Sequence, residues 1–148
     1  MLLGTLLLAF WLRIRGLFSG GLQADEALFA SWARLIAVWR DPLLTTQLVD
    51  KPPLAFYAQA LFYPLFGEVI WAARLPNFIA SLLLVGVTAV LAHQLTRSRP
   101  ASLLAALLVA CSPLAIQFST TAYTDPLLVT KLISALCAAL GKRPFIAG

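Results

Sequence analysis

Charged residues are scarce in this chain of 148 residues. Asp, Glu, Lys and Arg make up 11% of it and hydrophobic residues 61%, whereas soluble domains average about 25% charged and about 45–50% apolar residues. The mean hydropathy is +0.89. This composition excludes an ordinary soluble domain and is typical of a membrane protein.

Acidic residues are fewer than basic ones. Six Asp and Glu stand against 11 Lys and Arg, which gives a formal charge of +5. On a soluble protein this excess would suggest a nucleic-acid partner. Here the excess can be assigned to short connections between apolar segments, where membrane topology explains it. We therefore expect contact with membrane lipids and no binding of nucleic acid.

Cysteine is also rare, and familiar cofactor motifs are absent. Cys111 and Cys137 lie in apolar runs without a CxxC or CxxH spacing, which argues against a zinc site or a disulfide framework. Both are expected to be small buried hydrophobes. The sequence has no glycine-rich phosphate loop and no DxD-type run, so it requires no nucleotide cofactor. Dependence on a divalent metal stays open.

Four apolar segments predict an all-α, polytopic membrane protein. The first is about 18 Å long as a helix, shorter than the ~30 Å hydrocarbon core. It lacks the basic start and cleavage site of a signal peptide, so we expect an uncleaved span whose natural start lies upstream. Pro113 should kink the third segment. The second and third segments lack the polar face of a soluble bundle. The predicted spans are residues 1–12, 75–95, 101–118 and 126–140.

Short basic connections predict the orientation of these spans. Arg97 and Arg99 follow the second span, and Lys142 and Arg143 follow the fourth. Basic residues in short loops prefer the cytoplasm. The long segment 13–74 and the short segment 119–125 should therefore share the extracytoplasmic side.

The long segment is expected to contain interfacial helices. Large apolar residues recur at helical spacing from Glu26 to Arg40, with polar residues opposite, which is typical of an amphipathic helix lying in the membrane interface. Its tryptophans, Trp32 and Trp39, would lie at headgroup level. A second helix should begin at Pro53 and end near Tyr63, because Pro64 and Gly67 follow.

Carboxylates gather in the predicted extracytoplasmic segments. Asp25 and Glu26 begin the amphipathic helix, and Asp125 precedes Pro126 at the start of the fourth span. Each has a structural alternative, because Asp is a good N-cap and Glu suits the first helical turn. Ionisable groups at a membrane boundary nevertheless suggest function. Together with Asp50, these carboxylates are more numerous than helix capping alone requires.

Lys51 stands in the stretch Asp50-Lys51-Pro52-Pro53. A residue before proline is held in extended conformations, so Lys51 is kept out of the following helix. A fixed ammonium at the water–lipid boundary suits a phosphate partner. The alternative is a lysine that snorkels to the interface and pairs with Asp50.

Four stretches carry a resemblance to a known family. They are ADEALFASWARLI, VDKPPLAFYAQALFYPLFG, WAARLPNFIASLL and TAYTDPLLV. Together they resemble the N-terminal part of bacterial membrane glycosyltransferases related to dolichyl-phosphate-mannose protein mannosyltransferases and lipid A aminoarabinose transferases. The resemblance implies a multi-pass protein of the bacterial cytoplasmic membrane. It also implies inverting transfer of a hexose or pentose from a polyprenyl phosphate carrier to a protein, lipid or glycan acceptor.

The resemblance also implies roles for individual residues. Asp25 would be the catalytic base and Asp125 a second catalytic residue, while Lys51 would lie near the carrier phosphate. Further substrate-binding residues would be Glu26, Asp50 and Arg74. Lys131 departs from the family, which is apolar at this position.

Two other function classes are alternatives to the enzyme. Family members are several times longer, so we expect a fragment, and a non-catalytic subunit or inert remnant is the main alternative. A transporter fragment is less favoured, because its charges should lie near mid-bilayer on broken helices. Here they lie at the ends of spans.

Overall fold

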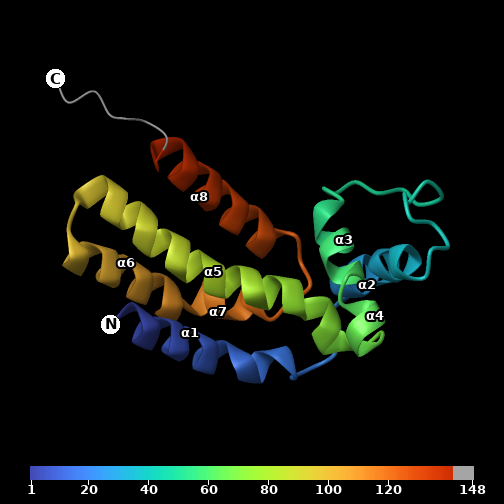
Figure 1. The fold of residues 1–148 in the computed structure, drawn as a ribbon. Coiled ribbons are helices and arrows are strands. Elements are labelled where there is room, and N and C mark those ends of the chain that lie inside the picture. Colours follow the sequence, from blue (N-terminus) through green and yellow to red (C-terminus); the bar gives the residue numbers. More distant parts are fainter. Residues whose placement is uncertain (142–148) are drawn as a thin grey trace.

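A computed structural model of the protein describes residues 1–141, and within this range the chain is all-helical (Figure 1). This confirms the predicted all-α class. Lys142 and Arg143, used to predict the orientation, lie outside the described residues. The helices are α1 (Leu2–Leu17), α2 (Ala24–Ala37), α3 (Leu54–Ala60), α4 (Tyr63–Phe66), α5 (Ile70–Thr96), α6 (Arg99–Cys111), α7 (Pro113–Ser119) and α8 (Asp125–Gly141).

The long helices form a bundle around α5, which packs against α1, α6 and α8 (Figure 1). Small side chains make the centre of this bundle: Ala9, Val85, Ala89, Ala106 and Ala110. Small residues let helix backbones approach closely, as in membrane bundles. Many leucines on the same helices are exposed, for example Leu3, Leu83 and Leu108. The bundle therefore presents an apolar outer surface.

Among residues 1–141, one helix is long and apolar enough to cross a membrane by itself. It is α5, with 27 residues, about 40 Å at roughly 1.5 Å per residue. The pair α6 and α7 makes a second span if it is counted as one, bent by 58°. The bend confirms the kink expected at Pro113. Helices α1 and α8 have 16 and 17 residues, so four spans stay a prediction.

Several predicted boundaries differ from the structure. The helix expected from Pro53 to about Tyr63 ends at Ala60, and a short helix, α4, begins at Tyr63 with Pro64 in its first turn. Helix α5 begins at Ile70 rather than Leu75 and continues through Pro76. Helix α1 continues past Leu12 to Leu17. In α1 the buried Arg13 guanidinium donates to the carbonyl oxygens of Val109 and Ala110, at 3.1 and 2.9 Å. Pro113 has no N–H for the Val109 carbonyl, so Arg13 completes the bonding of the bent α6–α7 pair.

Helices α2, α3 and α4 form a separate unit at one end of the bundle, which we call the end unit (Figure 1). Helix α2 confirms the amphipathic helix, but its apolar face packs on protein rather than lipid. Phe56 of α3 lies 5.4 Å from Phe29 and 4.9 Å from Trp32 between ring centroids. Trp32 is 3% exposed and Trp39 80%, so Trp39 alone of the two can reach headgroups.

Candidate functional site

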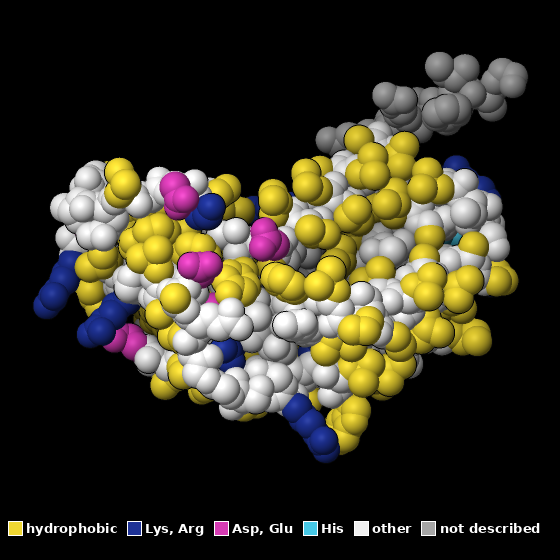
Figure 2. Space-filling model, turned by 180° about the vertical axis from the view of Figure 1, so that it is seen from behind, with side chains coloured by type: hydrophobic (Ala, Val, Ile, Leu, Met, Phe, Trp, Pro, Cys, Tyr) yellow, Lys and Arg dark blue, Asp and Glu magenta, His cyan; other side chains and the backbone are white. Residues whose placement is uncertain are grey.

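A polar cleft of about 440 Å³ lies where the end unit meets the bundle. Figure 2 shows acidic and basic side chains close together over the end unit, whereas much of the remaining face is hydrophobic. Three of the predicted site residues, Asp25, Lys51 and Asp125, line this cleft. They come from the start of α2, the loop before α3 and the start of α8.

Asp25 is available for chemistry. The N-cap of α2 is Gln23, and Asp25 is the second residue of the helix, so capping does not explain it. Its side chain is exposed, and no hydrogen bond or ion pair within residues 1–141 engages its carboxylate. Asp25 can therefore accept a proton or a hydrogen bond from a molecule in the cleft.

Lys51 pairs with Asp50 across 3.3 Å between Nζ and Oδ2, and both side chains are substantially exposed. Asp50 is outside the lining of the cleft. An exposed pair of this kind contributes little to stability, so the Lys51 ammonium can leave Asp50 for a stronger anion. The predicted substrate-binding role of Asp50 stays a prediction.

Glu26 and Arg74 are paired with each other in the interior. Arg74 donates through Nε and Nη2 to the two carboxylate oxygens of Glu26, at 3.2 and 3.1 Å. Their side chains are 1% and 6% exposed. Arg74 also donates to the carbonyl oxygens of Ser19 and Gly21. Their predicted substrate-binding role stays a prediction. In this arrangement the charge of each side chain is neutralised by the other.

Burial raises the pKa of Glu26, but the hydrogen bonds that its carboxylate accepts lower the pKa by more. They come from Arg74 and from the backbone N–H groups of Gln23 and Ala122, and they hold the pKa of Glu26 below its usual range. Charge-assisted hydrogen bonds favour the ionised carboxylate in this way. The pair therefore stays charged and joins α2, α5 and the segment before α8.

Three buried side chains hold the segment Thr121–Tyr123, which leads to Asp125. Glu26 accepts from the Ala122 N–H at 2.7 Å, and Gln59 donates to the Ala122 carbonyl at 3.0 Å. Asn77 donates to the carbonyls at both ends of the segment, at 2.7 and 2.6 Å. Neither Gln59 nor Asn77 was among the residues predicted from the sequence. They could have been found in the sequence as polar residues inside apolar helical runs, because a polar side chain that is buried needs a hydrogen-bond partner.

Tyr123 closes one wall of the cleft. Its hydroxyl donates to Gln23 Oε1 at 2.6 Å, and its ring lies 6.0 Å from that of Phe118. Burial raises the pKa of Tyr123, as do the negative charges of Asp25 and Glu26. The hydroxyl therefore stays protonated at neutral pH, and its proton is donated to Gln23, beside Asp25.

A second, apolar cleft adjoins the polar one. It encloses about 360 Å³ between α5, α7 and α8, with Leu84, Leu114 and Val129 among its walls. Phe118 and Asp125 line both clefts. Asp125 thus lies at the boundary between a polar compartment and an apolar one. Lys131, further along α8, is exposed.

A metal centre has no support in the part of the chain that the structure describes. No group of three or more His, Cys, Asp and Glu residues there could hold a metal ion. Cys111 and Cys137 are free. Cys137 is buried as expected, but Cys111 is exposed, so the prediction that both are buried was wrong for Cys111.

Comparison with known proteins places the chain in a family. The family described as dolichyl-phosphate-mannose-protein mannosyltransferase matches residues 50–141. The chain belongs to this family. The matched region of this mannosyltransferase-family chain includes Lys51, Arg74 and Asp125. Asp25 and Glu26 lie before the matched region.

Two relatives in Bacillus subtilis strain 168 are the mannosyltransferase candidates YycA and YkcB. Each is 34% identical to this chain, over 92 and 91 residues, which cover 60% and 59% of it. The aligned parts are 13% and 12% of the relatives, so the chain spans about an eighth of their length. No solved structure matches this mannosyltransferase-family chain.

Proposed function

We propose that this chain provides the donor-binding cleft of a membrane glycosyltransferase. The enzyme would transfer a sugar from a polyprenyl phosphate carrier to an acceptor hydroxyl or phosphate at the extracytoplasmic membrane face. One observation carries the proposal: Asp25, Lys51 and Asp125, distant in the sequence, line one polar cleft that adjoins an apolar cleft. A donor that consists of an apolar tail, a phosphate and a sugar needs an apolar cleft for the tail, next to a polar cleft for the phosphate and the sugar.

Each part of the donor has a candidate partner. The apolar cleft between α5, α7 and α8 would take the isoprenoid chain next to the phosphate. Lys51 would hold the phosphate, because an ammonium and a phosphate form strong charge-assisted hydrogen bonds. The sugar would lie in the polar cleft, where Tyr123 and Phe118 offer ring faces and Asp125 accepts hydrogen bonds from hydroxyls.

The reaction then follows from the positions of these groups. Asp25 takes the proton of the acceptor hydroxyl as general base. The acceptor oxygen bonds to the anomeric carbon as the bond from that carbon to the phosphate oxygen breaks. The lipid phosphate leaves with the electron pair, and Lys51 stabilises its charge. Attack from the face opposite to the leaving group inverts the configuration at the anomeric carbon.

The buried pair Glu26–Arg74 would act in this scheme through position alone. It fixes the first turn of α2, which bears Asp25, to the segment that leads to Asp125. Two carboxylates on different helices are thereby held across one cleft. Positioning of this kind contributes to catalysis by keeping reacting groups in register.

Binding of a polyprenyl phosphate sugar to the purified chain tests the proposal. Lys51→Met should weaken donor affinity by about tenfold or more, since a hydrogen bond to a charged group contributes about 1.5–3 kcal/mol. Lys51→Arg should be intermediate, because a planar fork does not reproduce a compact point charge. Pro52→Ala should give a milder loss by releasing Lys51 from its extended conformation.

Arg40→Met is the matched control, because Arg40 is an exposed cation of the same unit outside the cleft lining. It should leave donor affinity unchanged. An interfacial lysine without a phosphate role would give another order: arginine as good as lysine, and both Met and Pro52→Ala silent. That order would refute the assignment of Lys51.

A further inference from the structure

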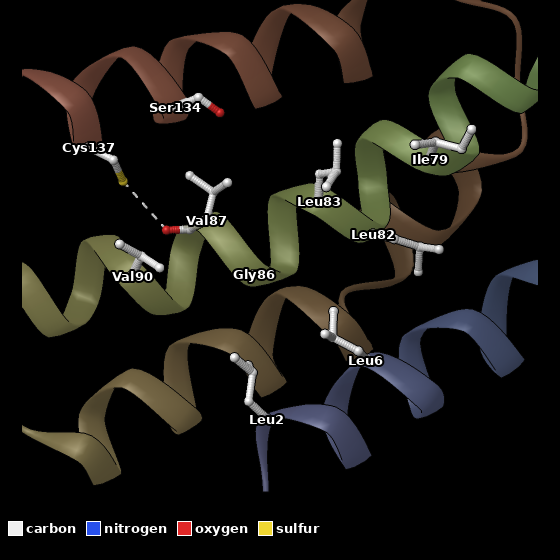
Figure 3. A pocket seen from close by; sticks show the side chains of 10 residues that line it. All are labelled: Leu2, Leu6, Ile79, Leu82, Leu83, Gly86, Val87, Val90, Ser134 and Cys137. Carbon is white, nitrogen blue, oxygen red and sulfur yellow. Dashed lines mark hydrogen bonds between the residues drawn. The ribbon is translucent and has the colours of Figure 1, made fainter.

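An apolar groove lies on the bundle outside the polar cleft, and a neighbouring cleft gives it a basic rim. The groove runs between α1, α5 and α8 and encloses about 730 Å³. Figure 3 shows aliphatic side chains of α1 and α5, among them Leu6 and Leu83, with Ser134 and Cys137 of α8 on the other side. A neighbouring cleft of about 570 Å³ shares Leu2 and Val90 with the groove and reaches His93, Gln94 and Arg99.

The length of the groove matches one leaflet of a bilayer. From Ile79 to Val90 it follows twelve residues of α5, about 16 Å along the helix axis. This is about half of the ~30 Å hydrocarbon core. An acyl chain that enters beside Val90 and extends to Ile79 would therefore reach the depth that acyl chains reach in one leaflet.

The rim of the groove has cations without carboxylates nearby. The Asp and Glu residues of the chain are at positions 25, 26, 41, 50, 68 and 125, so residues 69–124 contain none. Arg99, the first residue of α6, lies in that stretch and lines the neighbouring cleft, whereas Arg97 lies outside the lining of both the groove and this cleft. No ion pair within the described residues engages Arg97 or Arg99. The rim thus complements an anion.

A buried acceptor lies at the same rim. Gln94 lines the neighbouring cleft, and its Oε1 atom is buried without a hydrogen-bond partner among residues 1–141. A buried acceptor of this kind costs free energy until a donor reaches it. If the Gln94 side chain turns its oxygen into the cleft, a headgroup that combines a phosphate with a hydroxyl donor would satisfy both Arg99 and Gln94.

We propose that this groove binds an anionic phospholipid. One acyl chain lies between α1, α5 and α8 past Gly86, and the headgroup phosphate lies at Arg99. Basic pockets between membrane helices recognise anionic headgroups in this manner. The site is separate from the polar cleft, since none of its lining residues is shared with that cleft. It takes a lipid of the membrane itself rather than the sugar carrier.

The experiment is lipid retention by the purified 148-residue chain. The chain is equilibrated in nonionic detergent with equimolar phosphatidylglycerol and phosphatidylcholine of identical acyl chains, and retained lipid is quantified by mass spectrometry. We expect phosphatidylglycerol to be enriched about fivefold. Arg99→Gln should abolish the enrichment, and Arg99→Lys should preserve most of it. Arg97→Gln is the matched control, because Arg97 lies outside the groove lining.

A second variant tests the groove independently of charge. Gly86 has open space where a side chain would project, so Gly86→Leu should fill the groove and lower retention of both lipids. Ala138→Leu adds the same side chain at an exposed position of α8 outside the groove and should change nothing. Helical content by circular dichroism verifies that each variant folds. Equal retention of the two lipids, equal losses for Arg97→Gln and Arg99→Gln, or an unaffected Gly86→Leu would overturn the proposal.

Discussion

The end unit and the spanning bundle solve the packing problem with different side chains. The core of the end unit is aromatic, with Phe29, Trp32 and Phe56 in contact. Charged and amide side chains lie beside it: Glu26, Arg74, Gln59 and Asn77. The core of the bundle is built from alanine and valine, and its leucines face outward.

This difference shows which solvent each region is built for. In water, large apolar side chains go inside because their burial is the main favourable term. In lipid, leucine gains nothing by leaving the surface, so close contact between small residues holds helices together. The candidate site lies where the two regions meet, with a polar cleft on one side of Asp125 and an apolar cleft on the other.

The largest expected effect comes from breaking the ion pair that joins the two regions. Arg74→Met leaves the Glu26 carboxylate buried and unpaired, and should cost about 3–5 kcal/mol of unfolding free energy. Denaturant unfolding in detergent, followed by tryptophan fluorescence, measures this loss. The double variant Glu26→Gln/Arg74→Met should lose less than the sum of the single changes, because it leaves no buried charge.

Arg34→Met is the matched control for this prediction. Arg34 pairs with Glu68 at 2.7 Å, but the two side chains are 64% and 39% exposed. An exposed pair contributes about 0–1 kcal/mol. Equal losses for Arg34→Met and Arg74→Met would contradict the importance assigned to burial.

Removal of the proposed base should affect activity and leave the fold intact. Asp25→Asn keeps the size of the side chain but cannot take a proton, so sugar transfer should fall by about 10² or more. Unfolding free energy should change little, because Asp25 is exposed and its carboxylate has no partner within residues 1–141. Transfer of labelled sugar from the polyprenyl phosphate donor measures the first effect.

Glu68→Gln is the control for the loss of a carboxylate at this end of the molecule. Glu68 is partly exposed and lies outside the polar cleft, so its neutral variant should keep full transfer. Survival of activity in Asp25→Asn would reduce Asp25 to a residue of the first helical turn.

A third prediction tests close packing in the bundle. A Cβ atom at Gly16 would lie 2.8 Å from two side-chain atoms of Thr120, so Gly16→Ala should cost about 1–3 kcal/mol. Adding Thr120→Ala should recover part of this loss. Gly4→Ala in the same helix meets nothing within 4 Å and should be neutral or stabilising by about 0.5–1 kcal/mol. The same unfolding assay decides, and equal effects at Gly4 and Gly16 would contradict close approach.

The smallest expected effect concerns the loop between α2 and α3. Asp41 accepts hydrogen bonds from the side chains and backbone N–H groups of Thr45 and Thr46. The Thr46 bonds contribute most, and together the four lower the pKa of Asp41 to about 2. Because the folded pKa is depressed, the loop gains stability above the usual carboxyl pKa near 3.8 and loses it as the pH falls towards about 2.

Hydrogen exchange of peptides covering residues 41–47 measures this dependence. After correction for the intrinsic pH effect, protection in the loop should fall over that interval, and Asp41→Asn should show reduced protection at neutral pH. Peptides from α5 should keep their protection throughout. A loop whose protection is the same in the variant would contradict the anchoring role of Asp41.

Much of the helical framework could be predicted from the sequence. Apolar runs and helical periodicity gave α2, most of α5 and the bend at Pro113. Boundaries were less accurate where charged residues lie inside helices, as at Arg13 and Arg74. A charge ends a predicted span, but a folded chain can satisfy that charge with carbonyl groups from a distant helix.

The grouping of Asp25, Lys51 and Asp125 in one cleft was predictable, because the predicted topology, which stays a prediction, assigns all three to one membrane face. The partners of Glu26 were not predictable. Periodicity places Glu26 in the first turn of a helix, but nothing in the sequence pairs it with Arg74, which follows 48 residues later. Such a pairing depends on how α2 docks on α5, which is determined by the aromatic core of the end unit.

The bond between Arg13 and α6 has a consequence for synthesis of the chain. The partner carbonyls at Val109 and Ala110 follow Arg13 by 96 and 97 residues, and translation at about 5–20 residues per second needs on the order of 5–20 s to produce them. During that interval a guanidinium on an apolar helix lacks most of its acceptors, which is costly in hydrocarbon. The N-terminal helix should therefore wait at the translocon or the headgroups, and enter the bilayer only when α6 has been made.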